Sequence, residues 1–450
     1  MMRPSEMRSP MNRSLRPWLS MLLVTFMGAL NSNLILAATL TAGVAQIDLT
    51  PPLEMKCSLG GYGERMSKPA EGIHDRIWAK ALVLSDGEQK FAIITADMLG
   101  FPFPFKAELL AQLEEGDWKP EQIMMMASHS HASIEMNAIH SGNTFNIPQI
   151  GIYNEQVHQF TLANFKKLIE SADRQLREHP VEVQIGTSTT KIEGWNNNRR
   201  QEGYTDNDLT ITRVDTIDGL PLAVLVNFTA HPTFMSAEQM WFSAGWPGHL
   251  QRTLETLIGV DAMVMYYNGA QGDQSPRSRP DSGDSRWEKA ERYGVELGVV
   301  CFEQWKQTET NRDIPFRYQT ENFDLPPANW HPDFMQTGGK EYGLSVALLR
   351  LMIPRLFADK SNCTTVQIGD LSITGIPGEM AAGMGAEIKR AAGEKLNVKS
   401  PTIGGLADVW ISYILTEEAW EAGGYEASVS FYGPQLGPVV KKAAEASFPD

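Results

Sequence analysis

The chain has 450 residues, of which 42% are hydrophobic and 9% aromatic, and this composition is sufficient for a large buried core. Its formal net charge is −15 and the body of the chain has no basic run, which argues against a nucleic-acid-binding protein. Three widely spaced cysteines, Cys57, Cys301 and Cys363, exclude a disulfide framework and a zinc–thiolate cluster. A metal ion would therefore need histidine, carboxylate or phenolate ligands.

Residues 1–38 have the order of a secretory signal. Four arginines, an apolar stretch and two small residues follow one another: Arg3, Arg8, Arg13, Arg16, residues 18–30, Ala37 and Ala38. The apolar stretch is shorter than the about 20 residues of a membrane span. We therefore expect cleavage near Ala38, rather than an uncleaved anchor, and a secreted or periplasmic protein.

The rest of the chain, residues 39–450, alternates between strand and helix patterns. Apolar strands flanking a Gly/Asp turn predict β-hairpins at residues 80–100, 212–233 and 364–380. Uniformly apolar runs predict buried strands at 122–127 and 262–267. Helical periodicity predicts helices at 154–179, 285–307, 379–393 and 438–448. Together these segments predict one α/β domain, with a mixed sheet, flanking helices and an active site in loops at the strand ends.

Four of these strands end in polar loops with reactive side chains. These are His129 and His131 after residues 122–127, His231 after 222–229, Asp273 and Ser275 after 262–267, and Glu379 after 369–376. In mixed α/β folds, ligands bind at the carboxyl ends of strands. The pattern therefore predicts that these loops meet in one site.

His129 and His131 are separated by one residue. On a strand, residues at this spacing point to the same face, so the pair offers two ligands to one cation, or one ligand and one acid/base group. A hydrogen-bonded structural histidine is the alternative. Two imidazoles and one carboxylate, from His129, His231 and Glu379, suit a catalytic zinc ion with an open position. Taken alone, His231 also fits a turn before proline, and Glu379 fits a helix N-terminus.

The stretch "NGAQGDQSP" (268–276) predicts a tight turn that starts inside the molecule, after a buried pair, Tyr266 and Tyr267. We expect Ser275 at its apex, among backbone amides that stabilise an oxyanion; a polar surface turn is the alternative. Arg199, in "NNNRR", fits a solvated loop when taken alone.

Tyr413 and Tyr425 lie in an aromatic and glycine-rich segment (408–428) that is typical of core packing. A metal ion that lowered the pKa of Tyr413 would make it a phenolate ligand.

Taken in order, these motifs resemble the neutral/alkaline (non-lysosomal) ceramidase family, specifically its catalytic N-terminal domain. The matching stretches span about residues 42–428: "AGVAQIDLTPP", "GGYGERM", "EGIHDRIWAKALVL", "ASHSHAS", "NNNRR", "NFTAHPT", "NGAQGDQSP", "IPGEM" and "SYILTEEAWEAGGYEA". The resemblance implies a zinc-dependent amidase whose metal ligands are His129, His231, Glu379 and Tyr413. It also implies catalytic roles for Ser275, Asp273, His131, Arg199 and Tyr425.

The chain departs from the family pattern in places that bear on substrate selection. It reads "HSHASIE" where the family often reads His-Thr-His-Ser-Gly-Pro, and Gly245 stands where the family usually has Asp before an aromatic-Pro-Gly sequence. We expect the C-terminal β-sandwich-like domain of full-length members to be absent.

We expect a hydrolase that binds one Zn²⁺ per chain and cleaves the N-acyl amide bond of ceramide or a related lipid amide, with contact to a membrane surface. Two alternatives stay open: a metal-dependent esterase or phosphoesterase that uses Ser275, and a non-catalytic extracellular binding protein on the same fold. Within the amidase interpretation, Ser275 is either a nucleophile or a group that binds the substrate hydroxyl.

Overall fold

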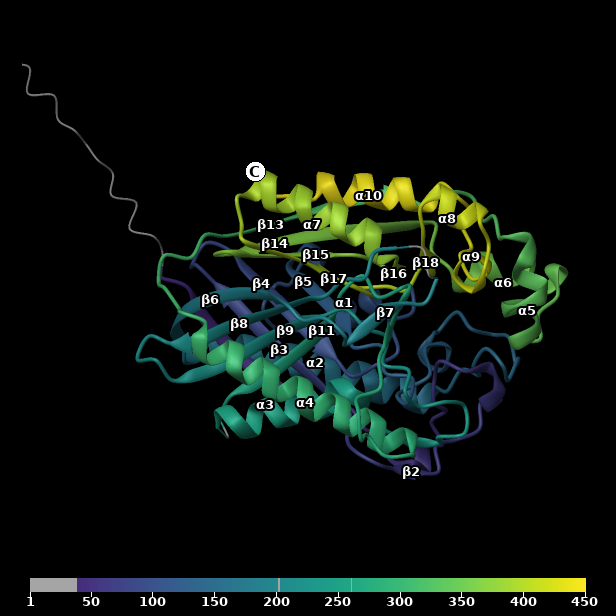
Figure 1. The fold of residues 1–450 in the computed structure, drawn as a ribbon, viewed down its shortest axis with the longest axis horizontal. Coiled ribbons are helices and arrows are strands. Elements are labelled where there is room, and N and C mark those ends of the chain that lie inside the picture. The colour runs from purple at the N-terminus through teal and green to yellow at the C-terminus, as the bar shows by residue number, and fades with distance from the viewer. Residues whose placement is uncertain (1–38, 201–202, 260) are drawn as a thin grey trace, which may run out of the picture. The chain divides into compact units, whose positions relative to one another are not determined.

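Two β-sheets packed face to face form the centre of the fold (Figure 1). The structure is a computed structural model that describes residues 39–200, 203–259 and 261–450, so the predicted signal at 1–38 lies outside the described residues. The large sheet has eight strands in the order β11-β9-β8-β6-β1-β3-β4-β5. The small sheet has four, in the order β13-β14-β15-β17.

The strands of the large sheet are β1 (Thr41–Asp48), β3 (Trp78–Ser85), β4 (Lys90–Ala96), β5 (Ile123–Ala127), β6 (Val181–Lys191), β8 (Asp208–Thr216), β9 (Pro221–Phe228) and β11 (Met263–Asn268). Those of the small sheet are β13 (Phe316–Asp324), β14 (Lys360–Ile368), β15 (Leu371–Gly375) and β17 (Ser400–Gly404). The large sheet is mixed, because β9–β11 and β4–β5 pair in parallel and the other neighbours are antiparallel. The predicted mixed α/β class, hairpins and buried strands are confirmed.

Each central strand buries both of its faces, which explains its uninterrupted apolar sequence. In β5, Met124 and Met126 pack between the two sheets, whereas Ile123 and Met125 pack under the outer helices. The alternation follows the two-residue period of a strand. Tyr266 and Tyr267 in β11 are buried, as predicted, and face opposite sides of the sheet.

Helices cover both outer faces of this sandwich (Figure 1). The large sheet is covered by α1 (Phe105–Gln112), α2 (Glu155–Glu178), α3 (Gly245–Ile258) and α4 (Arg286–Gln307), and the small sheet by α7 (Ala382–Leu396) and α10 (Leu436–Ala446). Shorter helices are α5 (Gly338–Glu341), α6 (Val346–Leu356), α8 (Glu417–Glu421) and α9 (Tyr425–Ser428), with 3₁₀ turns η1 (Leu53–Met55), η2 (Gly63–Arg65), η3 (Pro120–Gln122), η4 (Met136–Ile139) and η5 (Pro332–Gln336). In the described part of the chain, no helix combines the length and apolar character needed to span a membrane.

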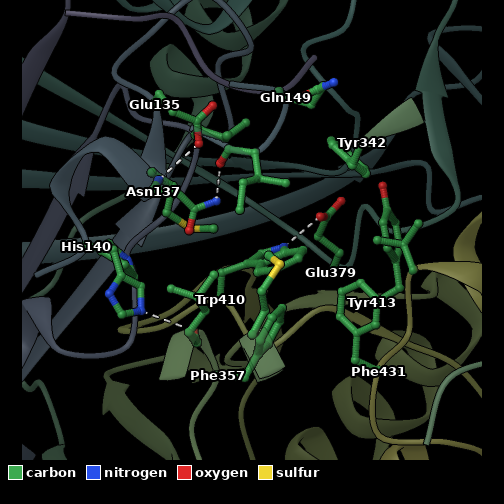
Figure 2. A pocket seen from close by; sticks show the side chains of 18 of the residues that line it. Glu135, Asn137, His140, Gln149, Tyr342, Phe357, Glu379, Trp410, Tyr413 and Phe431 are labelled. Carbon is green, nitrogen blue, oxygen red and sulfur yellow. Dashed lines mark hydrogen bonds between the residues drawn. The ribbon is translucent and has the colours of Figure 1, made fainter. Parts of the chain in front are cut away.

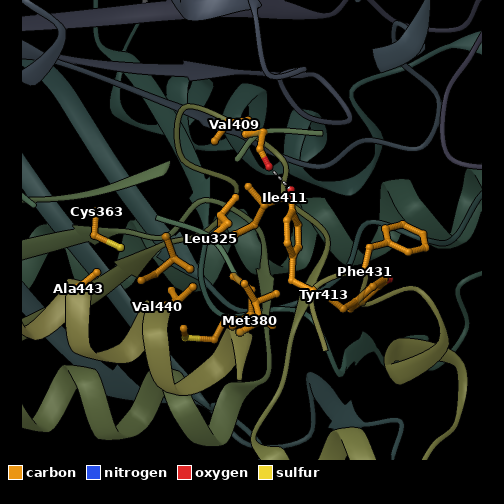
Figure 3. Packing of buried hydrophobic residues seen from close by; sticks show 14 of the residues in the cluster. Leu325, Cys363, Met380, Val409, Ile411, Tyr413, Phe431, Val440 and Ala443 are labelled. Atoms are coloured by element: carbon orange, nitrogen blue, oxygen red, sulfur yellow. Dashed lines mark hydrogen bonds between the residues drawn. The ribbon is translucent and has the colours of Figure 1, made fainter. Parts of the chain in front are cut away.

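Three two-stranded ladders join the loops that leave the sheets. They are β2 (Gly72–Ile73) with β10 (Trp241–Phe242), β7 (Asn196–Asn198) with β12 (Gln274–Pro276), and β16 (Glu379–Met380) with β18 (Tyr413–Ile414). The last ladder corrects the prediction that a helix starts at Glu379: the helix begins at Ala382, because residues 379 and 380 first pair with β18. On the helix-covered face of the small sheet, Met380, Ile411 and Tyr413 belong to the apolar cluster that packs against α10 (Figure 3).

Candidate metal centre and active site

A carboxylate lies between two imidazoles at the ends of three strands. The Oε2 atom of Glu379 is 3.3 Å from Nε2 of His129 and 3.0 Å from Nε2 of His231. All three side chains are buried. Three of the four predicted metal ligands thus lie together, with both imidazoles next to the same carboxylate oxygen.

The hydrogen bonds behind the rings orient these imidazoles. Nδ1 of His129 donates to the carbonyl of Leu99 at 2.6 Å, and Nδ1 of His231 donates to the carbonyl of Gln271 at 2.7 Å. In a neutral imidazole whose Nδ1 holds the proton, Nε2 carries a lone pair. Burial lowers the pKa of His231 to about 4, with a further contribution from the Arg199 charge, so this ring is neutral near pH 7.

The donor atoms of this cluster fit a cation. In the neutral tautomers, two nitrogen lone pairs and a carboxylate oxygen face one another, and Oε2 of Glu379 has no hydrogen-bond donor among the described residues. A tetrahedral zinc ion, with bonds of about 2.0–2.1 Å, separates its ligand atoms by roughly 3.3–3.4 Å. The observed separations of 3.0 and 3.3 Å approach this value. Backbone carbonyls behind metal-bound histidines are also a common arrangement.

The two histidines of the His-x-His motif do not lie on a strand, which corrects the argument that strand alternation places them on one face. Strand β5 ends at Ala127, and His129 adopts a left-handed backbone conformation with φ 69°. The amide of His129 donates to the carbonyl of Met98 after β4. The turn itself therefore directs the His129 ring toward Glu379.

Tyr413 reaches the site through the short ladder. Residues 379 and 413 are direct partners in the parallel pair β16–β18, so their side chains emerge on the same face. The Tyr413 hydroxyl accepts a hydrogen bond from the Arg199 guanidinium at 3.1 Å. Burial and the nearby Glu379 charge raise the pKa of Tyr413 well above its ordinary value, so the protein alone favours the neutral phenol.

Arg199 is a partly buried residue that connects two segments, and not the solvated loop residue that the sequence alone favours. Its Nε forms an ion pair with Glu426 at 2.7 Å, and its guanidinium also donates to the carbonyl of Gly272 at 2.6 Å. Burial alone would lower the pKa of Arg199, but the Tyr413 and Glu426 oxygens outweigh this effect and raise it. Arg199 therefore connects the loop after β11 to the segment that carries Tyr413 and Tyr425.

His131 lies beside the cluster with a different environment. Its ring is 4.7 Å from the His129 ring and 6.0 Å from the His231 ring, measured between centroids. Neither of its ring nitrogens has a hydrogen-bond partner among the described residues. Burial and the two neighbouring histidines lower the pKa of His131 well below its ordinary value. One ring nitrogen from each of the three histidines lies within 4.8 Å of the others, so His131 is also within reach of a bound ion.

A cavity lies beside this cluster, and Figure 2 shows part of its lining. Its polar lining includes His129, His131, Glu379, Tyr413 and Tyr425, and its apolar lining includes Phe357, Met352, Leu349, Phe431 and Trp410. Tyr425, at the start of α9, is 39% exposed, and its ring centroid is 6.0 Å from that of Tyr413. Five of the predicted site residues thus share one cavity whose lining is mostly apolar.

Ser275 does not line this cavity. It belongs to β12, where it pairs with Asn197, and it borders a separate surface hollow with Thr233 and Arg286. This placement corrects the expectation of a serine at the apex of a tight turn with free amides. The amides of Gln271, Gly272 and Gln274 in that loop donate to carbonyls of the chain.

Asp273 connects three segments through buried hydrogen bonds. Its carboxylate accepts from the amide of Ala382 at 2.9 Å, from the side chain of Asn198 at 2.8 Å and from the side chain of Gln274 at 2.8 Å. Burial raises the pKa of Asp273. The contacts of Asp273 position the start of α7 and the loop of Arg199.

Three residues of the site were not predicted from the sequence. Nε1 of Trp410 donates to Oε1 of Glu379 at 2.8 Å, and Glu426 neutralises Arg199. Arg65 is buried, and its guanidinium donates to the backbone carbonyl of His131, as well as to those of Gly60, Ser236 and Gln239. The only sequence signal for Arg65 was its position in a glycine-rich stretch. Nothing in the local sequence distinguished Trp410 or Glu426.

A second histidine group lies elsewhere on the protein. His74, Asp75 and His249 have potential ligand atoms within 4.8 Å of one another. The Arg252 guanidinium, however, contacts both Asp75 and His249 at 3.1 Å. This group already contains a cation, and it therefore fits a metal ion less well than the His129 cluster.

Comparison with known proteins gives a consistent result. Residues 40–276 match the family described as neutral/alkaline non-lysosomal ceramidase, N-terminal. The neutral ceramidase of Pseudomonas aeruginosa is 21% identical over 477 aligned residues, covering 87% of this chain and 69% of that protein. Its crystal structure superposes with a TM-score of 0.75 at 17% identity, over 91% of this chain and 74% of that one. A structure described as ceramidase complexed with C2 gives a TM-score of 0.74 at 17% identity, over 91% and 75% of the two chains.

Proposed function

The chain belongs to the neutral/alkaline non-lysosomal ceramidase family, and from this premise we propose that it is a zinc-dependent hydrolase. It cleaves the N-acyl amide bond of ceramide or a related lipid amide to a fatty acid and an amine. The observation that carries the proposal is the convergence of His129, His231 and Glu379 beside a mostly apolar cavity. A single carboxylate in this set favours an amidase over a phosphoesterase, for which we would expect more carboxylate ligands.

One set of residues would hold the ion, and another would contact the substrate. His129, His231, Glu379 and Tyr413 would hold Zn²⁺, which when bound supplies Lewis-acid chemistry by polarising the oxygen atoms it contacts. Arg199 positions the Tyr413 hydroxyl through the hydrogen bond described above. The apolar wall of the cavity binds the acyl chain and excludes water from the reacting carbonyl.

Proton transfer falls to His131. Its ring lies at the cavity wall next to His129, and its nitrogens are not used by other described side chains, so they are available to the substrate. His131 takes a proton from the water that attacks the carbonyl carbon and delivers it to the nitrogen of the leaving amine as the C–N bond breaks. Tyr425, which is partly exposed in the same cavity, donates its hydroxyl proton in a hydrogen bond to the carbonyl oxygen as negative charge develops there.

Metal analysis combined with hydrolysis of a fluorescent N-acyl-sphingosine tests this function. His129→Ala and His231→Ala should each lose zinc and activity, whereas Ser275→Ala, at a residue that borders a separate surface hollow, should keep both. Full zinc occupancy and full rate in His231→Ala would contradict the ligand assignment. Zinc binding without hydrolysis of any amide, ester or phosphate would favour a non-catalytic binding protein.

We further propose that residues 1–38 direct export and are removed near Ala38, on the strength of the arginine, apolar and small-residue order. Mass analysis of the mature N-terminus and fractionation of expressing cells test this point. An intact N-terminus in the cytoplasmic fraction would contradict it. A lipid amide substrate also implies contact with a membrane surface, which vesicle sedimentation would measure.

A further inference from the structure

Glu135 places a carboxyl group in the active-site cavity that the reaction described above does not use. It lines the same cavity as Glu379 and Trp410 (Figure 2). His131 lines this cavity too. Glu135 is the last residue of the "HSHASIE" stretch, which also carries His129 and His131. An acid inside a cavity proposed for lipid binding requires an explanation.

Only half of this carboxyl group has a structural role. Oε1 of Glu135 accepts the amide of Asn137 at 3.0 Å and so caps the 3₁₀ turn η4. Oε2 accepts no hydrogen bond from any other described side chain. Capping alone is better served by the shorter Asp, Asn, Ser or Thr. The additional methylene of glutamate therefore extends a second oxygen beyond what the cap requires.

The carboxyl group also lacks an ion-pair partner within the described residues. The positive charge that acts on it is the Arg65 guanidinium, which directs its hydrogen bonds to backbone carbonyls. Burial raises the pKa of Glu135 to about 7, against the lowering effects of Arg65 and of backbone amides. Near neutral pH both protonation states are therefore populated, and either state can form a hydrogen bond with a hydroxyl group.

The position of Glu135 next to His131 indicates which part of the substrate it meets. A Cβ atom on Gly60 would lie 3.4 Å from Oε2 of Glu135, and a Cβ on Gly61 would lie 2.3 Å from Nδ1 of His131. Both side chains thus contact the same two-residue stretch of backbone. Since His131 serves the leaving amine, the neighbouring Glu135 faces the amine portion, while Phe357 and other apolar residues form the part of the wall suited to the acyl chain (Figure 2).

We infer that Glu135 is a specificity-determining residue, which binds a hydroxyl group on the amine portion of the substrate and so selects amides of amino alcohols over amides of plain alkylamines. This inference rests on the proposed amidase function. A site built to bind a hydroxyl group discriminates strongly against the analogue that lacks it, because its own polar group is then left unpaired.

The test compares two amides of equal acyl length in the zinc-loaded full chain, N-octanoyl-ethanolamine and N-octanoyl-propylamine, in which a methyl group replaces the hydroxyl. We expect wild-type kcat/KM to favour the hydroxylated amide by about 10- to 100-fold, the range for one hydrogen bond to an ionisable group. Glu135→Asp keeps a capping carboxylate but withdraws the second oxygen, and Glu135→Leu removes both. Each should lower kcat/KM for the hydroxylated amide about 10-fold more than for its counterpart, with unchanged zinc content.

The outcomes separate three cases. An equal loss on both amides, accompanied by a lower melting temperature, would mean that Glu135 only caps η4, and it would overturn the inference. A wild-type enzyme with no preference between the amides would overturn it as well. If the wild type hydrolyses neither amide, calorimetric Kd values for the two compounds decide: a 10-fold preference that disappears in Glu135→Asp supports the hydroxyl site, and equal Kd values overturn it. The proposed amidase function itself fails only if the fluorescent N-acyl-sphingosine is not hydrolysed either.

Discussion

The hydrogen bond from Trp410 to Glu379 makes a quantitative prediction about metal affinity. Trp410→Phe keeps an aromatic ring in the cavity wall but removes the Nε1 donor that is 2.8 Å from Oε1 of Glu379. Without this donor the carboxylate loses its preferred orientation, in which Oε2 points between the two imidazoles. A hydrogen bond to a charged group contributes about 1.5–3 kcal/mol, and loss of such a supporting contact weakens metal binding by about 10- to 100-fold.

The assay is competition for zinc between the protein and a chromophoric chelator at constant pH. The matched control is Trp420→Phe, since the Nε1 of Trp420 has no hydrogen-bond partner in the described part of the chain. We expect the Kd for zinc to rise about 10- to 100-fold in Trp410→Phe and to stay near the wild-type value in Trp420→Phe. A Kd within twofold of wild type for Trp410→Phe, or an equal rise in both variants, would refute the reasoning.

Three further predictions concern the geometry, the pH response and the ion. Gly61→Ala should abolish most activity while zinc is retained, because its Cβ would lie 2.3 Å from Nδ1 of His131. Gly87→Ala controls for backbone strain, since Gly87 has nearly the same φ (92° against 91°) and no atom within 4 Å of its Cβ. Similar activities in the two variants would contradict this prediction. Burial raises the pKa of Asp97 to about 6, above its value of about 3.9 in an unfolded chain. The folded state therefore holds the proton more tightly, and the free energy of unfolding falls by about 3 kcal/mol as the pH rises from about 4 to above 6. In urea titrations Asp97→Asn should lack this loss, and parallel pH profiles for variant and wild type would count against it. Zinc at about 100 times its Kd should stabilise the fold by about 2.7 kcal/mol, which calorimetric melting with and without a chelator measures; an unchanged melting temperature would argue against a resident ion.

Local sequence determined most of the secondary structure and part of the site. Uninterrupted apolar runs identified β5 and β11, and Gly/Asp turns identified the hairpins, because burial and turn geometry are properties of a few adjacent residues. The same logic located His129, His231 and Glu379, since each follows a strand whose end can be recognised. The family resemblance was needed to select Tyr413, whose own surroundings predict only a core residue.

Contacts between distant segments decided the rest. Ser275 lies outside the cavity because β12 pairs with β7, which is about 80 residues away in sequence. Trp410 reaches Glu379 because backbone hydrogen bonds hold its segment against Phe101 and Pro377. Glu135 acquires its raised pKa from burial in the assembled cavity. Even the His-x-His motif depends on such contacts, because a left-handed turn held by the backbone after β4 orients His129. Sequence therefore specifies which groups are available for chemistry. The directions of these side chains and their pKa values follow from packing and desolvation, which depend on several distant stretches of sequence together.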